Sequence, residues 1–328
     1  IDVDAATIMA DSTDGDVNIN SNATAGVTVS TLTTGAGAIN FAQTGSQTLE
    51  VTTATTTDGG IAISNDNATL TVGTVTAADV VPNDLHDVTL TTTTSGDVVL
   101  GAVIADNKAT VNSAGSIIDN NGAANNITAV TATLTAGAAV GATGAGAIDT
   151  NVTDLEASAG GTGGIHVSDA GALNVSGTGL TTAGGDIEIT AATSYSQDDV
   201  DIVANGGAVT ITADAIDFTN NSGDNAVQTS GTLTIKPLAA NAPMSLGGAS
   251  AFDLSLAEIL DLTGMGTPTD IVIGDSAASI GLLTIGAPVN LAGKTLSLHA
   301  GSFTDNNNVY AISANTLTLN ARTGAVGN

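Results

Sequence analysis

The chain has 328 residues, of which 32 are acidic and 4 are basic, so its formal net charge is −28 at pH 7. It has no cysteine, which excludes disulfide bonds, and no run of apolar residues is long enough to predict a membrane span. Proteins that bind nucleic acid neutralise phosphates with lysine and arginine. The sequence therefore argues against a nucleic-acid partner, because its basic residues are only Lys108, Lys236, Lys294 and Arg322.

Hydrophobic residues make up 42% of the chain, close to the value of globular proteins and unlike that of disordered segments. Aromatic residues make up only 2%, so we expect a narrow core built from Val, Ile, Leu and Ala. The chain opens with Ile1-Asp2-Val3-Asp4, without a secretion signal, and stops at Thr323–Asn328 in what resembles the middle of a repeat. We therefore expect it to be a piece of a longer protein.

Short segments in which apolar and polar residues alternate follow turn residues along the chain. The segments that begin at a glycine are Gly15–Ile19, Gly37–Phe41, Gly60–Ile63, Gly96–Leu100, Gly164–Val167, Gly185–Ile189 and Gly207–Ile211. Segments without a leading glycine are Val27–Val29, Leu49–Val51, Leu70–Val72, Leu173–Val175 and Leu233–Ile235. Alternation rich in Val, Ile and Thr is typical of β-strands. Segments of each kind recur about every 22 residues, so each repeat is predicted to contain at least two strands.

This spacing favours a solenoid over a β-sandwich, because a sandwich needs a wider core and about 100 residues for each unit. We predict an all-β, right-handed parallel β-helix of roughly 15 coils, each about 20–23 residues long. Residues 1–235 are expected to form regular repeats, and residues 236–328 to continue the β-helix with a short helix-bearing insertion. In this arrangement Ile187 and Ile189 face inward and Glu188 faces outward.

One segment breaks the alternation and predicts a short helix over residues 256–262. Ser255 is its candidate N-cap, and Glu258 stands three residues on, where it closes a capping box. Leu254 and Ile259 occupy the positions of a hydrophobic staple. The helix is expected to end near Gly264.

Three stretches from this segment onward resemble a known family. They are Leu254–Leu262 with Ile273-Gly274-Asp275, then Leu296–Gly301, then Leu317–Gly327. The stretches resemble the repeat region of filamentous haemagglutinin-like proteins, and the upstream Gly-Asp-Ile-x-Ile repeats look like coils of the same family. The resemblance implies a large bacterial surface protein exported by two-partner secretion or by an autotransporter route.

Acidic residues near the middle of the chain call for a comparison with β-helical enzymes that cleave glycans. Inverting glycosidases hold two carboxylates about 6.5–9.5 Å apart. Asp198, Asp199, Asp201 and His166 are the nearest approach to such a set, but no Lys or Arg lies nearby and His166 lacks a second flanking glycine. We predict no enzymatic activity. His86, His166 and His299 are far apart in sequence, and we expect each to face solvent.

Calcium is the metal for which the sequence offers candidate ligands, since hard cations bind several oxygens. The densest oxygen cluster includes Asp11, Asp14 and Asp16, and weaker clusters occur at residues 220–225 and 305–308. None of these matches an EF-hand loop or a tandem calcium-binding β-roll repeat. We predict no other cofactor, and place the candidate calcium site at the three aspartates.

These observations predict a structural protein of the extracellular space or bacterial cell surface. It would be the β-helical shaft of a large adhesin or fibre, with copies of itself or neighbouring repeats of its own chain as partners. One alternative is a module that binds carbohydrate or a host surface through an exposed aromatic or polar groove, and another is a β-helical glycan-cleaving enzyme. The aromatic residues are dispersed along the sequence, at Phe41, Tyr195, Phe218, Phe252, Phe303 and Tyr310.

Overall fold

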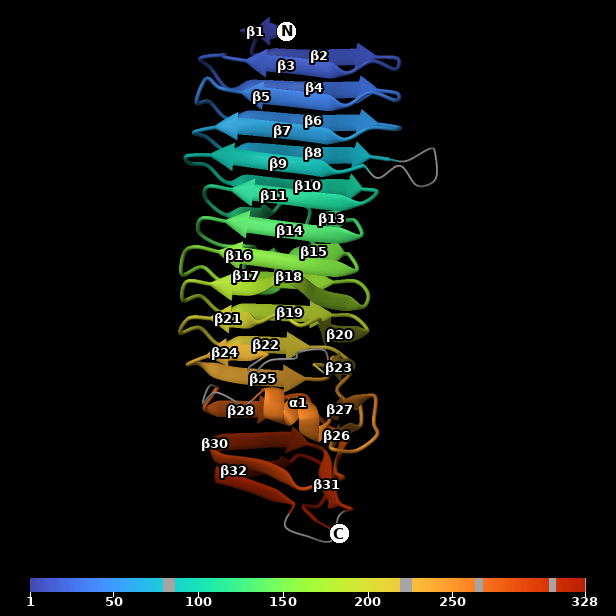
Figure 1. The fold of residues 1–328 in the computed structure, drawn as a ribbon, viewed down its shortest axis with the longest axis vertical. Coiled ribbons are helices and arrows are strands. Elements are labelled where there is room, and N and C mark those ends of the chain that lie inside the picture. Colours follow the sequence, from blue (N-terminus) through green and yellow to red (C-terminus); the bar gives the residue numbers. More distant parts are fainter. Residues whose placement is uncertain (79–85, 219–225, 263–267, 307–310, 328) are drawn as a thin grey trace. The chain divides into compact units, whose positions relative to one another are not determined.

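The computed structural model describes residues 1–78, 86–218, 226–262, 268–306 and 311–327. The chain is an all-β parallel solenoid of about 14 turns, which confirms the predicted fold class and fits a right-handed parallel β-helix (Figure 1). It divides into two compact units, residues 1–167 and 168–328.

Two parallel sheets, A1 and B1, form the first unit. Sheet A1 contains β1 (Asp2–Val3), β3 (Val17–Ser21), β5 (Ile39–Gln43), β7 (Ile61–Asp66), β9 (Val88–Thr93), β11 (Lys108–Ser113), β14 (Thr131–Ala136) and β16 (Asp154–Ala159), each paired with the next. Sheet B1 contains β2 (Thr7–Ser12), β4 (Val27–Thr34), β6 (Leu49–Thr56), β8 (Leu70–Ala77), β10 (Val98–Ala105), β13 (Ile127–Thr128) and β15 (Ile148–Asn151), with β12 (Ile117–Asp119) also paired to β10. Figure 1 shows the A1 strands running opposite to the B1 strands, as expected when each coil contributes one strand to each sheet.

The core of the first unit consists of columns of aliphatic side chains from successive coils. In sheet A1, Ile39 pairs with Ile61; in sheet B1, Val29 pairs with Val51, and Val51 with Val72. All five side chains are buried, while the residue that follows each of them in the sequence points outward. Because side chains alternate faces along a strand, the parallel register places like residues on top of one another.

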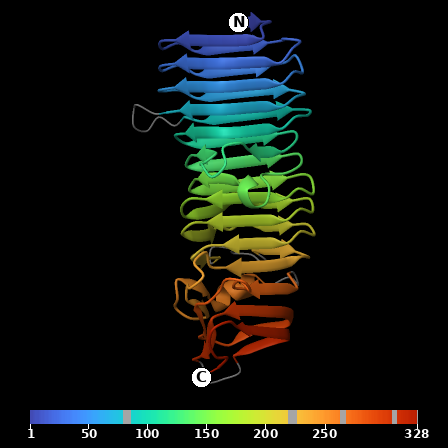
Figure 2. The same ribbon diagram turned by 180° about the vertical axis from the view of Figure 1, so that it is seen from behind.

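The second unit has a corresponding pair of sheets, A2 and B2, and a third sheet, C2 (Figure 2). Sheet A2 contains β18 (Leu173–Thr182), β20 (Ser194–Gln197) and β23 (Ala215–Asp217), and β18 also pairs with β21 (Ile202–Ala204), which pairs with β24 (Val227–Thr229). Sheet B2 contains β19 (Ile187–Ala191), β22 (Val209–Thr212), β25 (Thr232–Lys236), β28 (Asp270–Ile273), β30 (Val289–Ala300) and β32 (Ile312–Ala321). Sheet C2 follows the order β27 (Phe252–Leu254), β26 (Met244–Leu246), β29 (Leu282–Ile285) and β31 (Ser302–Asp305). Strand β17 (Ile165–Asp169) crosses the division between the units, and η1 (Gly144–Gly146) is a single 3₁₀ turn.

The predicted register of the second unit is confirmed at β19. Ile187 and Ile189 are buried, with Glu188 half-buried between them. Coil length is less uniform than predicted. The pair Ile39–Ile61 fits the expected spacing, but Leu70 pairs with Val98 and Leu233 with Ile271. The parallel register is kept across these longer coils, and the additional residues of the second include β26 and β27.

The predicted helix is present as α1 (Leu256–Asp261), and both hydrogen bonds of the capping box are formed. The Ser255 side chain accepts from the Glu258 backbone, while Glu258 Oε2 accepts from the Ser255 N–H at 2.7 Å. Glu258 is also buried, and its Oε1 accepts from the N–H of Phe218, the residue after β23, at 2.9 Å. Gly264, where the helix was expected to end, lies outside the described residues. Within the described residues, no helix is long and apolar enough to cross a lipid bilayer.

The alternation of faces predicts unequal effects from one substitution at adjacent positions of β6. Val51 is 0% exposed, whereas Thr52 points to solvent. Val51→Asp buries a carboxylate without a partner and should lower the free energy of unfolding by about 3 kcal/mol or more. Thr52→Asp should change it by less than about 0.5 kcal/mol. Urea unfolding of both variants measures the difference, and equal losses would contradict the assigned faces.

Candidate functional site

A polar groove lies on the outward face of sheet A1, with a volume of about 420 Å³. Four consecutive strands, β3, β5, β7 and β9, each contribute two outward residues to it. The register places these residues in two columns, Asn18–Asn40–Ala62–Thr89 and Asn20–Ala42–Ser64–Thr91. The groove exists because small side chains on β5 and β7 lie between asparagines on one side and threonines on the other.

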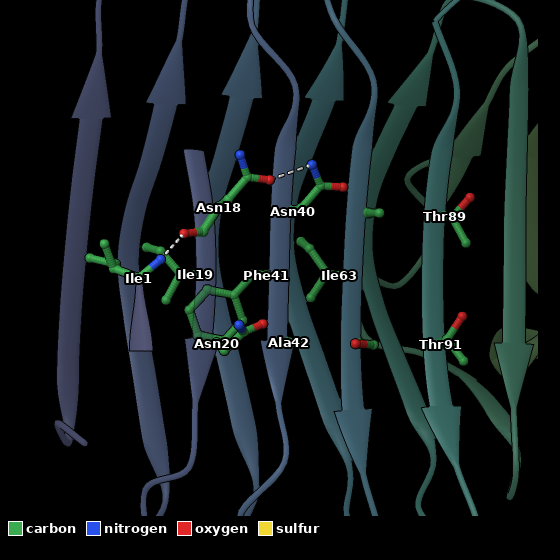
Figure 3. Close-up of a pocket in the computed structure, with 12 residues that line it drawn as sticks. Ile1, Asn18, Ile19, Asn20, Asn40, Phe41, Ala42, Ile63, Thr89 and Thr91 are labelled. Atoms are coloured by element: carbon green, nitrogen blue, oxygen red, sulfur yellow. Dashed lines mark hydrogen bonds between the residues drawn. The ribbon is translucent and has the colours of Figure 1, made fainter. Parts of the chain in front are cut away.

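The asparagines along the groove are linked to one another and to the first strand (Figure 3). Asn40 Nδ2 donates to Asn18 Oδ1 at 2.9 Å, and Asn20 Nδ2 donates to Asp2 Oδ1 at 3.1 Å. These bonds orient the amides, while Thr89 and Thr91 border the groove on the strand farthest from Asn18 (Figure 3). Beneath the groove, Phe41 is buried in the core.

The side chains that line the groove are uncharged, so they cannot act as general acid or base at neutral pH. The one charged group at the groove is the amino group of Ile1, which donates to Asn18 O at 2.7 Å. Amide and hydroxyl groups both donate and accept hydrogen bonds, and the alanine methyl groups add a small apolar floor. This combination suits a neutral ligand rich in hydroxyl groups.

Aromatic side chains do not contribute to any exposed binding surface among the described residues. The core buries Phe41, Tyr195, Phe218, Phe252 and Phe303, each at most 4% exposed. Tyr310 lies outside the described residues. Sequence reasoning treated the aromatic residues as dispersed, and it missed the polar groove, which depends on register across four coils.

The three candidate calcium ligands all lie on the surface near the turn between β2 and β3. Asp11, Asp14 and Asp16 are exposed. The Thr33 hydroxyl donates to Asp11 Oδ1, and the Ala38 N–H donates to Asp16 Oδ1 at 2.9 Å. Among the described residues, no group of three or more His, Cys, Asp or Glu side chains is arranged to hold a metal ion. Residues 220–225 and 307–308 of the weaker clusters lie outside the described residues.

The bond at Asp16 belongs to a recurring link between coils. In the turns at Asp16, Asp97 and Asp186, each preceded by a glycine, the carboxylate accepts a hydrogen bond from a backbone N–H in the following coil. Asp97 Oδ1 accepts from Ser116 at 2.7 Å, and Asp186 Oδ1 accepts from Ala208 at 2.8 Å. Hydrogen bonds to a charged acceptor are stronger than neutral ones. The Gly-Asp motif therefore has a structural role, which the repeated motif could have signalled.

The acidic residues considered for glycan cleavage lie in and beside the turn that follows β20. Asp198 and Asp199 are exposed, and Asp199 has a φ of 52°, in the left-handed region that favours glycine. Asp201 is half-buried, and Gln228 Nε2 donates to its Oδ2 at 2.9 Å. Burial raises the pKa of Asp201, the bond from Gln228 opposes this, and the charge of Asp199 adds to the rise. Gln228 also lines a cavity of about 360 Å³, together with Asn205.

The three histidines are held in separate environments. His166, in the first unit, is 5% exposed, so the expectation that it faces solvent is wrong. Its backbone N–H donates to Val140 O, earlier in the chain, at 2.8 Å. His86 Nε2 lies 2.7 Å from Asp58 Oδ1. His299 is half-buried, and burial lowers its pKa while the charge of Asp275 opposes this.

Comparison with known proteins places the chain beside none of them. No protein family, no curated protein sequence and no solved structure matches it.

The environment of Asp201 predicts a pH-dependent gain from removing its charge. A carboxyl group whose folded pKa lies above its unfolded pKa costs stability when it is ionised, and that cost disappears once acid protonates it. Asp201→Asn should therefore raise the thermal midpoint at pH 7, and the gain should fade as the pH falls to the ordinary range of aspartate. Scanning calorimetry from pH 7 to pH 3 measures this, with Asp198→Asn in the exposed turn as the control. A gain that is constant with pH would contradict the assignment.

Proposed function

We propose that this chain is a structural extracellular protein, the β-helical shaft of a large bacterial surface adhesin or fibre. The observation that carries the proposal is the parallel coil-to-coil pairing in each unit, over a core of aliphatic columns. Such a solenoid is stabilised by contacts between neighbouring coils, so its length can grow by adding coils. The resemblance of its repeats to filamentous haemagglutinin-like proteins supports a cell-surface location.

The outward surface supports the same proposal. With 32 acidic and 4 basic residues, the chain repels polyanions and stays hydrated. Its Gly-Asp carboxylates are used to link coils, as at Asp97 and Asp186. An extended, negatively charged shaft requires these properties, and it requires no catalytic group.

Strand β32 is the surface through which copies would associate. Among the described strands β32 pairs only with β30, so its other edge can pair with neighbouring repeats of the same chain or with a second copy. Leu317, which pairs with the core residue Leu296, is 42% exposed. An open strand edge with exposed apolar side chains is a template for pairing with another chain. We therefore propose self-association through this edge, opposed by the net charge and strengthened by salt.

Leu317→Asp tests this surface. Adding a charge to the apolar side of the edge should weaken self-association about tenfold, equivalent to ~1.4 kcal/mol. Thr318→Asp is the matched control, because Thr318 is its exposed neighbour on the other face of β32 and should leave association unchanged. Sedimentation velocity and electron microscopy at several salt concentrations measure the effect. A wild-type chain that stays monomeric at high concentration and high salt would contradict self-association.

Adding a calcium chelator in the same measurements tests whether self-association requires calcium. If calcium bound by Asp11, Asp14 and Asp16 is required, chelation should shorten the assemblies, and Asp14→Ala should reproduce that result without chelator. Assemblies whose length is unchanged both by the chelator and by Asp14→Ala would contradict a calcium requirement.

The polar groove of sheet A1 favours a second candidate function, binding of a neutral carbohydrate. Hydroxyl-rich ligands need donors and acceptors in fixed positions, and Asn18, Asn40 and Thr91 supply them along four coils. Asn40→Ala should weaken binding of neutral oligosaccharides about tenfold in a glycan array and in calorimetry. Asn112→Ala, outside the groove on β11, should not change it. Equal losses in both variants, or no binding by the wild-type chain, would contradict this function.

A further inference from the structure

Three polar side chains form a buried column inside the first unit, at the ends of β3, β5 and β7. Ser21, Gln43 and Asn65 are 0%, 1% and 0% exposed. They are stacked in register, with Ser21 paired to Gln43 and Gln43 to Asn65. We call these three residues the polar column. They occupy inward positions at strand ends, as the buried Thr34 and Thr56 do in sheet B1.

The amide groups of the column satisfy backbone carbonyls of the adjacent turns. Gln43 Nε2 donates to Ala23 O at 3.2 Å, and Asn65 Nδ2 donates to Ala68 O at 3.0 Å and to Thr69 O at 2.8 Å. These bonds explain why a polar residue is placed at this corner, since a buried carbonyl without a donor is costly.

The oxygens of the same three side chains have no partner. Ser21 Oγ, Gln43 Oε1 and Asn65 Oδ1 are buried and make no hydrogen bond in the structure. A buried acceptor that loses water without replacement destabilises the fold by the desolvation penalty of that group. Three such atoms in three consecutive coils, all in one column, point to a shared ligand.

In the next two coils the residues at the same corner, Thr92 and Ser113, have hydroxyl groups whose oxygens are hydrogen-bonded. Thr92, which pairs with Asn65, donates to Gly96 O at 2.8 Å and accepts from the Ala114 N–H at 2.9 Å. Ser113 donates to Ser116 O at 2.9 Å and accepts from the Val98 N–H at 3.2 Å. A hydroxyl group is therefore sufficient at Thr92 and Ser113, whereas the Ser21 hydroxyl has no partner and the amides of Gln43 and Asn65 each bring an acceptor that is left over.

We propose that the polar column binds internal water molecules, each donating its two O–H groups to oxygens of neighbouring coils. Strands in a sheet lie about 4.8 Å apart. That spacing is too long for a direct hydrogen bond, and it suits one water that contacts both oxygens at about 2.8 Å. Buried waters in proteins occupy such positions, between polar groups that lack other partners.

The chemistry of the column selects water over a metal ion. Its three oxygens belong to one hydroxyl and two neutral amides, and no carboxylate takes part. A cation placed there would be buried without a counter-charge, which is far more costly than burying a neutral molecule. A water molecule supplies the two donors that the amide oxygens lack.

The test measures water bound inside the wild-type chain. Water-to-amide cross-relaxation in NMR should show long-lived water next to the side-chain NH₂ protons of Gln43 and Asn65, and oxygen-17 relaxation dispersion should show internal waters. The double variant Gln43→Thr/Asn65→Thr copies the hydroxyl solution of the neighbouring coils and should lose that water. Asn40→Thr, which changes an exposed amide on β5, is the control and should retain it.

Two results would overturn the proposal. The first is an absence of long-lived water at Gln43 and Asn65 in the wild-type chain, which does not depend on whether any variant folds. The second is a sodium-23 or potassium-39 relaxation signal that the wild-type chain shows and the double variant loses, since this would assign the column to a cation.

Discussion

The parallel pairing of each coil with the next, at one fixed register, is the constraint on which the rest of the structure depends. The pairs Val29–Val51 and Val51–Val72 show the result, since a residue on one coil is covered by its equivalent on the following coil. Close packing then requires small aliphatic side chains, because a column of large rings would not fit between two sheets. Few aromatic residues are enough for such a core, and those described are buried within it.

The same register decides what the surface can do. A feature of the outer face is made from the same position of several coils, so it extends along a column. The groove arises in this way from Asn18, Asn40, Ala62 and Thr89, none of which is notable within its own coil. Asp201, whose pKa is raised by burial, lies in a corner, whereas the side chains that line the groove are uncharged.

The sequence predicts the features that are local or periodic. Alternation is enough to place Ile187 and Ile189 inward, and the spacing of Ser255 and Glu258 is enough to predict the capped helix. Features that join different coils are harder to predict, because their partners are distant in sequence. The link from Asp16 to the Ala38 N–H and the groove belong to this class, since both need the register as well as the pattern.

Buried polar residues escape prediction for a related reason. Gln43 ends an alternating strand, where an amide is expected to face a solvent-exposed turn, yet it is 1% exposed. Its position becomes understandable only when the turn carbonyl at Ala23 is seen to need a donor. His166 is a second residue that is buried against expectation, at 5% exposed, although it stands between the two inward residues Ile165 and Val167.

The uneven coil length has an evolutionary consequence. Leu70 pairs with Val98 and Leu233 with Ile271 in the same parallel sense as the shorter coils, so the ladder keeps its register across coils of different length. Closing a flexible loop becomes only slightly less favourable as it lengthens, by about 0.6 kcal/mol for each doubling. Insertions at the corners are therefore nearly neutral for folding. A solenoid of this kind can therefore acquire longer corner loops without a change in its inward columns.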